Sequence, residues 1–208
     1  MIKLCVFDFD STLMDGETID IFADAYGVGD KVKEITKKAM QGELDFFESL
    51  SKRVALLNGM PTSLVSEVCS NLKQMNGAKE LVKGLKERGI KVIVFSGGFH
   101  IATDLMREEI GYDESFANIL HEKDGVLTGL VGGEMMFGFS KGEMIKRMQK
   151  ILGVSKDETM CVGDGANDAS MFKHAGISVA FCAKEILKKS ATHCVDTKDL
   201  REILRILD

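Results

Sequence analysis

The sequence feature that most constrains the fold is an apolar strand near the N-terminus that ends in two acids. Residues 2–12 read IKLCVFDFDST, so the apolar run gives way to Asp8 and Asp10 and then to a polar turn. Such a run is typical of a buried strand in a parallel sheet. Because side chains at i and i+2 of a strand point the same way, the two carboxylates are expected side by side at its carboxyl end. Ligands of open α/β sheets bind at that edge.

Two adjacent carboxylates repel each other unless a proton or a cation lies between them. A hard divalent cation, which prefers oxygen ligands, resolves this repulsion most directly. The alternative is a strand end with two helix-capping aspartates, and the pair by itself does not decide between the two interpretations. The rest of the chain therefore has to be considered.

Composition and charge exclude several classes of protein. The 208 residues are 45% hydrophobic and 28% charged, which is ordinary for a globular protein with one core or with one domain that carries an insertion. The net charge of −5 and the lack of a long basic block argue against nucleic-acid binding. No apolar run approaches the ~18 residues that span a bilayer.

The cysteines and histidines have no spacing that indicates a disulfide framework or a zinc site. The five cysteines are scattered, no Cys-x-x-Cys pair occurs, and the four histidines lack metal-ligand spacing. The cysteines are therefore expected to be reduced. The N-terminus leads directly into a strand and does not resemble a signal peptide, so a cytoplasmic protein is predicted.

The hydrophobic pattern predicts a helical insertion within an α/β sheet domain. Between residues 15 and 74 it predicts four consecutive helices, over 19–26, 32–40, 44–57 and from Pro61 onward. From Gly77, strands alternate with helices, and the predicted elements include a helix at 167–175, a strand at 177–181 and a helix at 199–206. Asp124-Gly125 predicts a β-hairpin. The fold class is therefore a doubly wound parallel sheet, a Rossmann-like core (residues 1–14 and 75–208), with a helical cap (15–74) and a hairpin. A cap at this position is suited to exclude water and to select the substrate.

Polar residues follow other strand ends as well. Ser96-Gly97-Gly98 follows the strand predicted at 90–95, where glycine N–H groups can approach an anion, although a simple turn is the better explanation of this segment taken alone. Lys141 begins a helix, where a cation opposes the helix dipole, so it either serves an anionic group or is a solvated lysine. Residues 163–168, GDGAND, add further acids but do not form a dinucleotide-binding fingerprint. Taken together, these residues indicate a phosphoryl-transfer site.

The ordered set formed by 8–12, 96–98, Lys141 and 163–168 resembles the haloacid dehalogenase (HAD) superfamily of phosphatases. The helices after the first strand resemble the C1-type cap of that superfamily. Within it, the chain is most similar to the phosphoserine phosphatases, on the segments 7–12, 17–18, 52–54, 96–99 and 163–172. The segment 135–139, MMFGF, is more apolar than the pattern of this family.

This resemblance implies a two-step hydrolysis that depends on Mg²⁺. Asp8 is then the nucleophile that forms an aspartyl-phosphate, and Asp10 is the general acid and base. The Asp8 side chain, the Asp10 backbone carbonyl and the Asp164 side chain are the implied Mg²⁺ ligands, and Asp168 supports them.

The resemblance also implies the substrate, which is the small molecule O-phosphoserine. Glu17 is expected to pair with its α-ammonium group and Arg53 with its α-carboxylate. An acid at a helix N-terminus and a surface charge are the alternatives for these two residues. The phosphoryl group is expected to contact four residues: Ser96, Gly97, Lys141 and Asn167. The protein is expected to be a monomer or a homodimer with no nucleic-acid or membrane partner.

Two other functions compete with this interpretation. A relative with the same cap could hydrolyse another small phosphomonoester or transfer the phosphoryl group to an alcohol, and Glu17 with Arg53 argues for an amino-acid phosphate instead. A phosphorylatable receiver-like switch also uses acids and a lysine on a doubly wound sheet. Receivers place the acceptor on a middle strand and lack a helical cap, and Asp10 provides a base that shortens the life of an aspartyl-phosphate.

Overall fold

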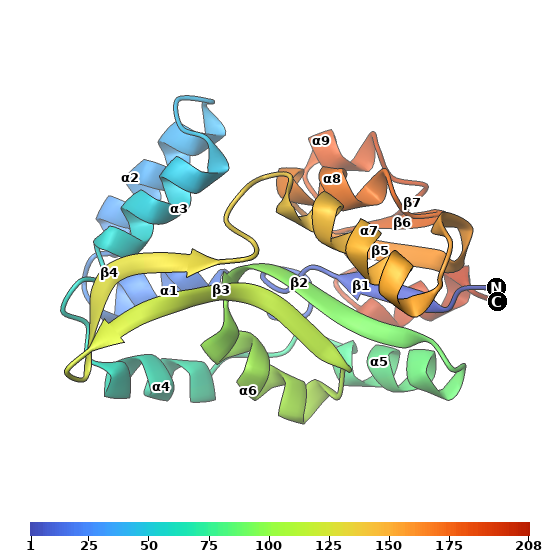
Figure 1. Cartoon of the computed structure of the whole chain (residues 1–208), viewed down its shortest axis with the longest axis horizontal. Coiled ribbons are helices and arrows are strands. Elements are labelled where there is room, and N and C mark those ends of the chain that lie inside the picture. The colour runs from blue at the N-terminus through green and yellow to red at the C-terminus, as the bar shows by residue number, and fades with distance from the viewer.

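The computed structural model describes residues 1–208 and contains one seven-stranded sheet (Figure 1). The strand order is β4-β3-β2-β1-β5-β6-β7, and all neighbours are parallel except the β3–β4 hairpin. The strands are β1 (Leu4–Phe7), β2 (Lys91–Phe99), β3 (Glu114–Lys123), β4 (Val126–Gly133), β5 (Thr159–Gly163), β6 (Ile177–Phe181) and β7 (His193–Val195). The predicted α/β fold with a doubly wound sheet is confirmed.

Helices cover both faces of the sheet because alternate side chains of each strand point to opposite faces. Cys5 and Phe7 of β1 belong to one apolar cluster and Leu4 and Val6 to another. The first cluster includes apolar residues of α5 (Ala78–Glu87) and α6 (His100–Ile110). The second includes residues of α7 (Ser140–Leu152), α8 (Ala169–Phe172) and α9 (Glu185–Lys188). Figure 1 shows these two helical layers on either side of the strands.

The insertion after β1 forms the four predicted helices, α1 (Thr18–Ala25), α2 (Gly29–Met40), α3 (Phe46–Ala55) and α4 (Thr62–Ser70). Helix α3 begins at a capping box, in which the Asp45 side chain accepts from the Glu48 N–H and the Glu48 side chain accepts from the Asp45 N–H. In Figure 1, α2 and α3 extend away from the sheet, with α3 in contact with β4, whereas α1 and α4 lie near β3, β4 and α6.

The helices of the insertion share their apolar residues with the sheet domain. One cluster of 37 buried residues contains side chains of all four inserted helices together with strand residues. Phe22 of α1 stacks on Phe99 at the end of β2, with ring centroids 5.9 Å apart and an angle of 20° between the rings. The buried surface between α1 and the sheet therefore ties the insertion to the rest of the protein.

Some boundaries differ from the sequence predictions. Residues 96–98 continue β2 as strand instead of forming a turn, and the β2–β3 register shifts between Phe95 and Phe99. The helix predicted at 167–175 is a short 3₁₀ turn followed by the four-residue α8. The C-terminal segment Leu200–Ile206 is 3₁₀ helix and not α-helix. An apolar pattern does not distinguish these two helix types over so few residues.

The strand order places a topological switch point beside β1. From β1 the chain continues through β2, β3 and β4 on one side, and then crosses to β5, β6 and β7 on the other. The loops that follow β1 and β5 therefore diverge and leave a crevice at their carboxyl ends, which is where open α/β sheets bind ligands.

Replacing Phe22 by Ala tests whether the insertion and the sheet unfold as one unit. Because Phe22 is fully buried, we expect Phe22→Ala to lower the free energy of unfolding by about 3–5 kcal/mol. Urea denaturation followed by circular dichroism and by a probe on α1 should still show a single coincident transition. Ile151→Ala, at a side chain that is 74% exposed, is the matched control and should change stability little. Two separate transitions for Phe22→Ala would contradict a shared core.

Candidate active site

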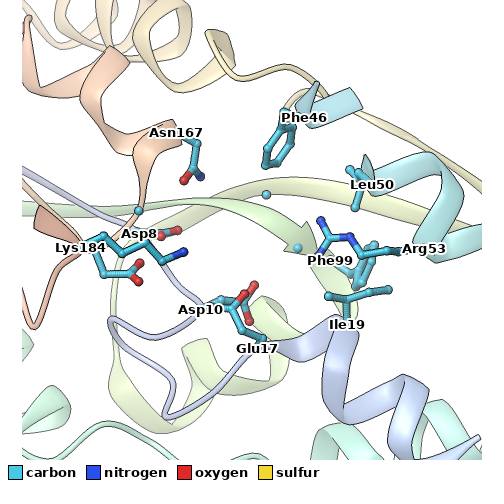
Figure 2. Close-up of a pocket in the computed structure, with 14 residues that line it drawn as sticks. Asp8, Asp10, Glu17, Ile19, Phe46, Leu50, Arg53, Phe99, Asn167 and Lys184 are labelled. Carbon is cyan, nitrogen blue, oxygen red and sulfur yellow. The ribbon is translucent and has the colours of Figure 1, made fainter. Parts of the chain in front are cut away.

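The crevice at the switch point is a cavity of about 110 Å³ between the sheet edge and the inserted helices (Figure 2). Four strands contribute to it at their carboxyl ends. These residues are Asp8 and Asp10 after β1, Gly97, Gly98 and Phe99 at the end of β2, Asp164, Gly165 and Asn167 after β5, and Lys184 after β6. The inserted helices contribute Glu17, Ile19, Phe46, Leu50 and Arg53.

A buried lysine holds together the acids at the base of this cavity. The Lys141 Nζ atom lies 2.6 Å from Asp8 Oδ1 and 2.6 Å from Asp168 Oδ1. Burial favours the neutral amine, but Asp168 and Asp8 outweigh it and raise the pKa of Lys141 above its usual value. Lys141 begins α7, so the structure places this helix-start cation against acids rather than in solvent.

Asp168 also shapes the loop after β5. Its Oδ2 atom accepts the backbone N–H groups of Asp164 at 3.1 Å and Gly165 at 2.9 Å. A side chain at Gly163 would place a Cβ atom 2.4 Å from the same carboxylate oxygen, so only glycine fits there. Asp168 therefore fixes the loop that presents Asp164 and Asn167 to the cavity.

Asp10 is held by the first turn of α1. The Thr18 backbone N–H donates to Asp10 Oδ1 at 2.8 Å, and the Thr18 hydroxyl donates to the same oxygen. Burial, together with the charge of Glu17, raises the pKa of Asp10 to about 7 despite these bonds. A carboxyl group with a pKa near neutrality is suited to both give and take a proton.

The strand segment 96–98 lies close to the acids. The buried Ser96 hydroxyl accepts the Gly98 N–H at 2.9 Å. A Cβ atom at Gly98 would lie 2.7 Å from Asp10 Oδ2, and one at Gly97 would lie 2.7 Å from the Phe46 ring. Both glycines are therefore needed for close approach, to the acid at Gly98 and to the inserted helix α3 at Gly97.

The insertion adds one acidic and one basic side chain to the cavity. Glu17 precedes α1 and accepts the Ser11 hydroxyl at 2.7 Å. Arg53 of α3 points into the cavity beside Leu50 (Figure 2), and its Nε donates to the Ser49 carbonyl at 3.3 Å. Burial lowers the pKa of Arg53, while the charges of Asp20, Glu17 and Asp10 oppose this shift.

The acid cluster suits a divalent cation. Carboxylate oxygens of Asp8, Asp164 and Asp168 all lie within 4.8 Å of one another. Burial and the neighbouring acids raise the pKa of Asp8 above its usual range and the pKa of Asp164 to about 6, and Lys141 only partly offsets this in each case. Such shifts show an excess of negative charge, which a hard cation with oxygen ligands would neutralise.

Comparison with known proteins assigns the family. The family model described as "Hydrolase: haloacid dehalogenase-like hydrolase" matches residues 2–176. The chain belongs to the haloacid dehalogenase-like hydrolases. Curated relatives in this family include the phosphoserine phosphatase of Wolinella succinogenes, 64% identical over 97% of this chain and 98% of the relative. The phosphoserine phosphatase of Methanocaldococcus jannaschii is 50% identical over 99% of this chain and 97% of the relative.

Solved structures of the same family superpose closely on this fold. A substrate-bound phosphoserine phosphatase complex has a TM-score of 0.94 and 50% identity, and covers 99% of this chain and 98% of the other. A phospho-aspartyl intermediate analogue of phosphoserine phosphatase has a TM-score of 0.93 at the same identity and coverage. None of the helices in this family member has the length and apolarity needed to cross a membrane.

The structure brings together every residue that the sequence singled out, and it adds others. Asp8, Asp10, Glu17, Arg53, Gly97, Asp164 and Asn167 line the cavity directly, whereas Ser96, Lys141 and Asp168 lie behind them. The sequence assigned no role to Thr18 or Lys184, and it expected Gly98 only as a backbone N–H near an anion and not as the space that Asp10 occupies. One feature of the sequence could have identified Lys184 as a site residue. It lies just beyond the strand predicted at 177–181, and therefore at the same sheet edge as the acids.

The apolar segment 135–139 divides between the core and the surface. Met135 and Met136 are buried, whereas Phe137 and Phe139 are exposed and stack on each other with ring centroids 5.3 Å apart. Phe47 of α3 stacks on Phe137 at 5.4 Å. This row of rings links the α2–α3 pair to the loop that precedes Lys141.

The raised pKa values predict how the stability of the metal-free protein depends on pH. In the folded protein the pKa of Asp10 is about 7 and that of Asp164 is about 6, whereas the ordinary pKa of an aspartate is 3.8. Between about pH 4 and pH 7 the folded state holds more protons than the unfolded state, so the free energy of unfolding should fall as the pH rises, by up to about 1.4 kcal/mol per pH unit for each proton.

Urea denaturation in EDTA between pH 5 and pH 8 measures this slope. Asp10→Asn should make it shallower, and a saturating divalent cation should stabilise the protein more at pH 8 than at pH 5, because protons compete for the same oxygens. A slope that is flat in EDTA and unchanged in Asp10→Asn would show that these carboxyl groups have ordinary pKa values.

Proposed function

We propose that this chain is a Mg²⁺-dependent phosphatase that hydrolyses O-phospho-L-serine to serine and phosphate through an aspartyl-phosphate. The observation that carries this proposal is the pair formed by Asp8 and Asp10 at one cavity. Asp8 is held by Lys141, and Asp10 has a pKa of about 7. The similarity to a substrate-bound phosphoserine phosphatase over nearly the whole chain supports the choice of substrate.

Asp8 is oriented as a nucleophile by bonds to one of its two oxygens. The Phe9 N–H donates to Asp8 Oδ1 at 2.7 Å, and Lys141 donates to the same atom. Oδ2 has no hydrogen-bond partner and is free to attack phosphorus. In the first step, Oδ2 bonds to phosphorus, the bond from phosphorus to the serine oxygen breaks, and Asp10 gives its proton to that oxygen.

Hydrolysis of the aspartyl-phosphate completes the cycle. Asp10, now a carboxylate, takes a proton from a water molecule whose oxygen attacks phosphorus, and the bond between phosphorus and Asp8 Oδ2 breaks. Phosphate leaves and Asp8 is restored. Lys141, the Ser96 hydroxyl and the Gly97 N–H are proposed to hold the phosphoryl oxygens, and Asn167 to orient them.

Asp8, Asp164 and the Asp10 backbone carbonyl are proposed to hold Mg²⁺, with Asp168 in support. The three clustered carboxylates and their raised pKa values fit such an ion. When bound, Mg²⁺ supplies positive charge that lowers the repulsion between the acids and the incoming phosphate.

Residues 15–74 are proposed to act as the cap that selects the substrate. Glu17 and Arg53 supply an acidic and a basic side chain, as the α-ammonium and α-carboxylate groups of phosphoserine require, and Arg53 lies across the cavity from Asp8 (Figure 2). Phe46 and Leu50 add apolar surface to the same cavity. The protein is proposed to act on this small molecule in the cytoplasm, as a monomer or a homodimer.

A panel of phosphomonoesters tests the substrate. With Mg²⁺, phosphate release should be fastest from L-phosphoserine, slower from phosphoethanolamine and p-nitrophenyl phosphate, and lost in EDTA. Arg53→Ala should reduce kcat/KM for L-phosphoserine by about 30- to 100-fold, the loss expected for a charge-assisted pair worth about 2–3 kcal/mol. Its activity on p-nitrophenyl phosphate should fall less than about threefold.

Lys52→Ala is the matched control, because Lys52 is the exposed neighbour of Arg53 on the same helix. It should leave both activities unchanged. An equal loss on both substrates in Arg53→Ala would remove the case for carboxylate recognition. Equal rates on the whole panel in the unmodified protein would favour a related phosphatase or phosphotransferase for another phosphomonoester.

Asp8→Asn tests the nucleophile. Asn has nearly the same shape but is not a nucleophile in this chemistry, so kcat should fall by at least about a thousandfold. Circular dichroism should show an unchanged fold. A covalent phosphoryl adduct trapped by rapid acid quench should appear in the unmodified protein and be absent from the variant. An adduct of equal yield in Asp8→Asn would assign the nucleophile to another residue.

A further inference from the structure

Lys184 lies in the loop between β6 and α9, at the same sheet edge as the acids. Its backbone N–H donates to the Asp164 carbonyl at 3.1 Å, and the preceding Ala183 is buried. This backbone hydrogen bond holds Lys184 next to the loop that carries Asp164 and does not involve the Lys184 side chain.

The Lys184 side chain points into the cavity. In Figure 2 its ammonium group is turned toward the centre of the site, beside Asp8. The nearby Lys188 pairs with Glu185 at 3.1 Å and Asp196 at 2.8 Å, whereas the Lys184 ammonium takes part in no ion pair of the chain. A lysine that faces several acids without pairing with any of them is available to an anionic ligand.

The cavity has two such cations, on opposite sides. Arg53 enters from the inserted helix α3, beside Leu50, whereas Lys184 enters from the sheet domain, beside Asp8 (Figure 2). The phosphorus atom must reach Asp8, so the far end of the substrate faces Arg53. The anionic group within reach of Lys184 is then the phosphoryl group and not the carboxylate.

The balance of charges around the cavity favours an additional cation at the phosphate site. Asp8, Asp10, Glu17 and Asp164 line the cavity against only Arg53 and Lys184. Lys141 is already bound to two carboxylates. A phosphate monoester carries about −1.5 to −2 charges at neutral pH, so it needs further positive charge to enter this acidic cavity.

We propose that Lys184 is a phosphate-binding residue that contacts the phosphoryl group of the substrate and the inorganic phosphate product. This proposal rests on the proposed function for the position of the phosphorus atom, but not for the identity of the alcohol. It adds a second side-chain cation to the phosphate site, in addition to Lys141.

The test compares Lys184→Met, Lys184→Gln and Lys184→Arg, with Lys189→Met as the matched control. Lys189 is an exposed lysine at the end of α9 that does not line the cavity. The measurements are KM and kcat on L-phosphoserine and p-nitrophenyl phosphate, inhibition by inorganic phosphate, and calorimetric binding of inorganic phosphate to the Mg²⁺-loaded protein. Thermal midpoints show which variants are folded.

We expect Lys184→Met and Lys184→Gln to weaken inorganic phosphate binding about tenfold and to raise KM for both substrates by a similar factor. Lys184→Arg should restore both to within about threefold, and Lys189→Met should change neither. A loss confined to L-phosphoserine would place Lys184 at the carboxylate and overturn the proposal. Unchanged phosphate binding in the folded Met and Gln variants would also overturn it.

The same data separate this proposal from the proposed function. If the unmodified protein showed no preference for L-phosphoserine, while phosphate binding still depended on Lys184, the substrate assignment would fail and the phosphate role would stand. If the preference were present and phosphate binding did not depend on Lys184, the reverse would hold.

Discussion

The interaction on which the site depends is the buried contact of Lys141 with Asp8 and Asp168. All three side chains are nearly inaccessible, and removing a charge from water is costly unless a partner of opposite sign is in contact. Lys141 comes from the start of α7, Asp8 from the end of β1 and Asp168 from the loop after β5. One ammonium group therefore connects three chain segments, and Asp168 in turn positions Asp164 and Gly165 through their backbone N–H groups.

Even with this contact, the acidic side chains at the cavity outnumber the basic ones. The resulting negative charge is the basis of the metal binding and proton transfer proposed for the site. Burial raises the pKa values of Asp10 and Asp164, the charge of Glu17 raises both further and that of Asp168 adds to the shift of Asp164, while Lys141 offsets these effects only partly. A divalent cation would relieve the cluster around Asp8, whereas burial and the charge of Glu17 keep Asp10 protonated near neutrality. The same geometry thus suits the two acids to the separate roles of nucleophile and proton carrier proposed for them.

The inserted helices are attached to this site in two different ways. Helix α1 is anchored by apolar packing, with Phe22 on Phe99, and it carries the residues that flank Asp10. The α2–α3 pair reaches the sheet domain through rings, with Phe46 against Gly97 and Phe47 on Phe137, and through the packing of α3 on β4. Arg53, the residue proposed to recognise the substrate carboxylate, therefore lies on a helix that is itself packed against the sheet domain.

The sequence by itself determined the fold class, the helical insertion and the ordered acids, because strand alternation, helical spacing and i, i+2 geometry are local properties. Asp8, Asp10 and Lys141 were identifiable on those grounds, and the resemblance added Glu17 and Arg53. Only the tertiary structure decided that Thr18 holds Asp10, that Gly98 makes room for it and that Lys184 faces the cavity. These contacts join residues from separate elements, and whether a lysine meets solvent or a phosphate site depends on the packing of the whole chain.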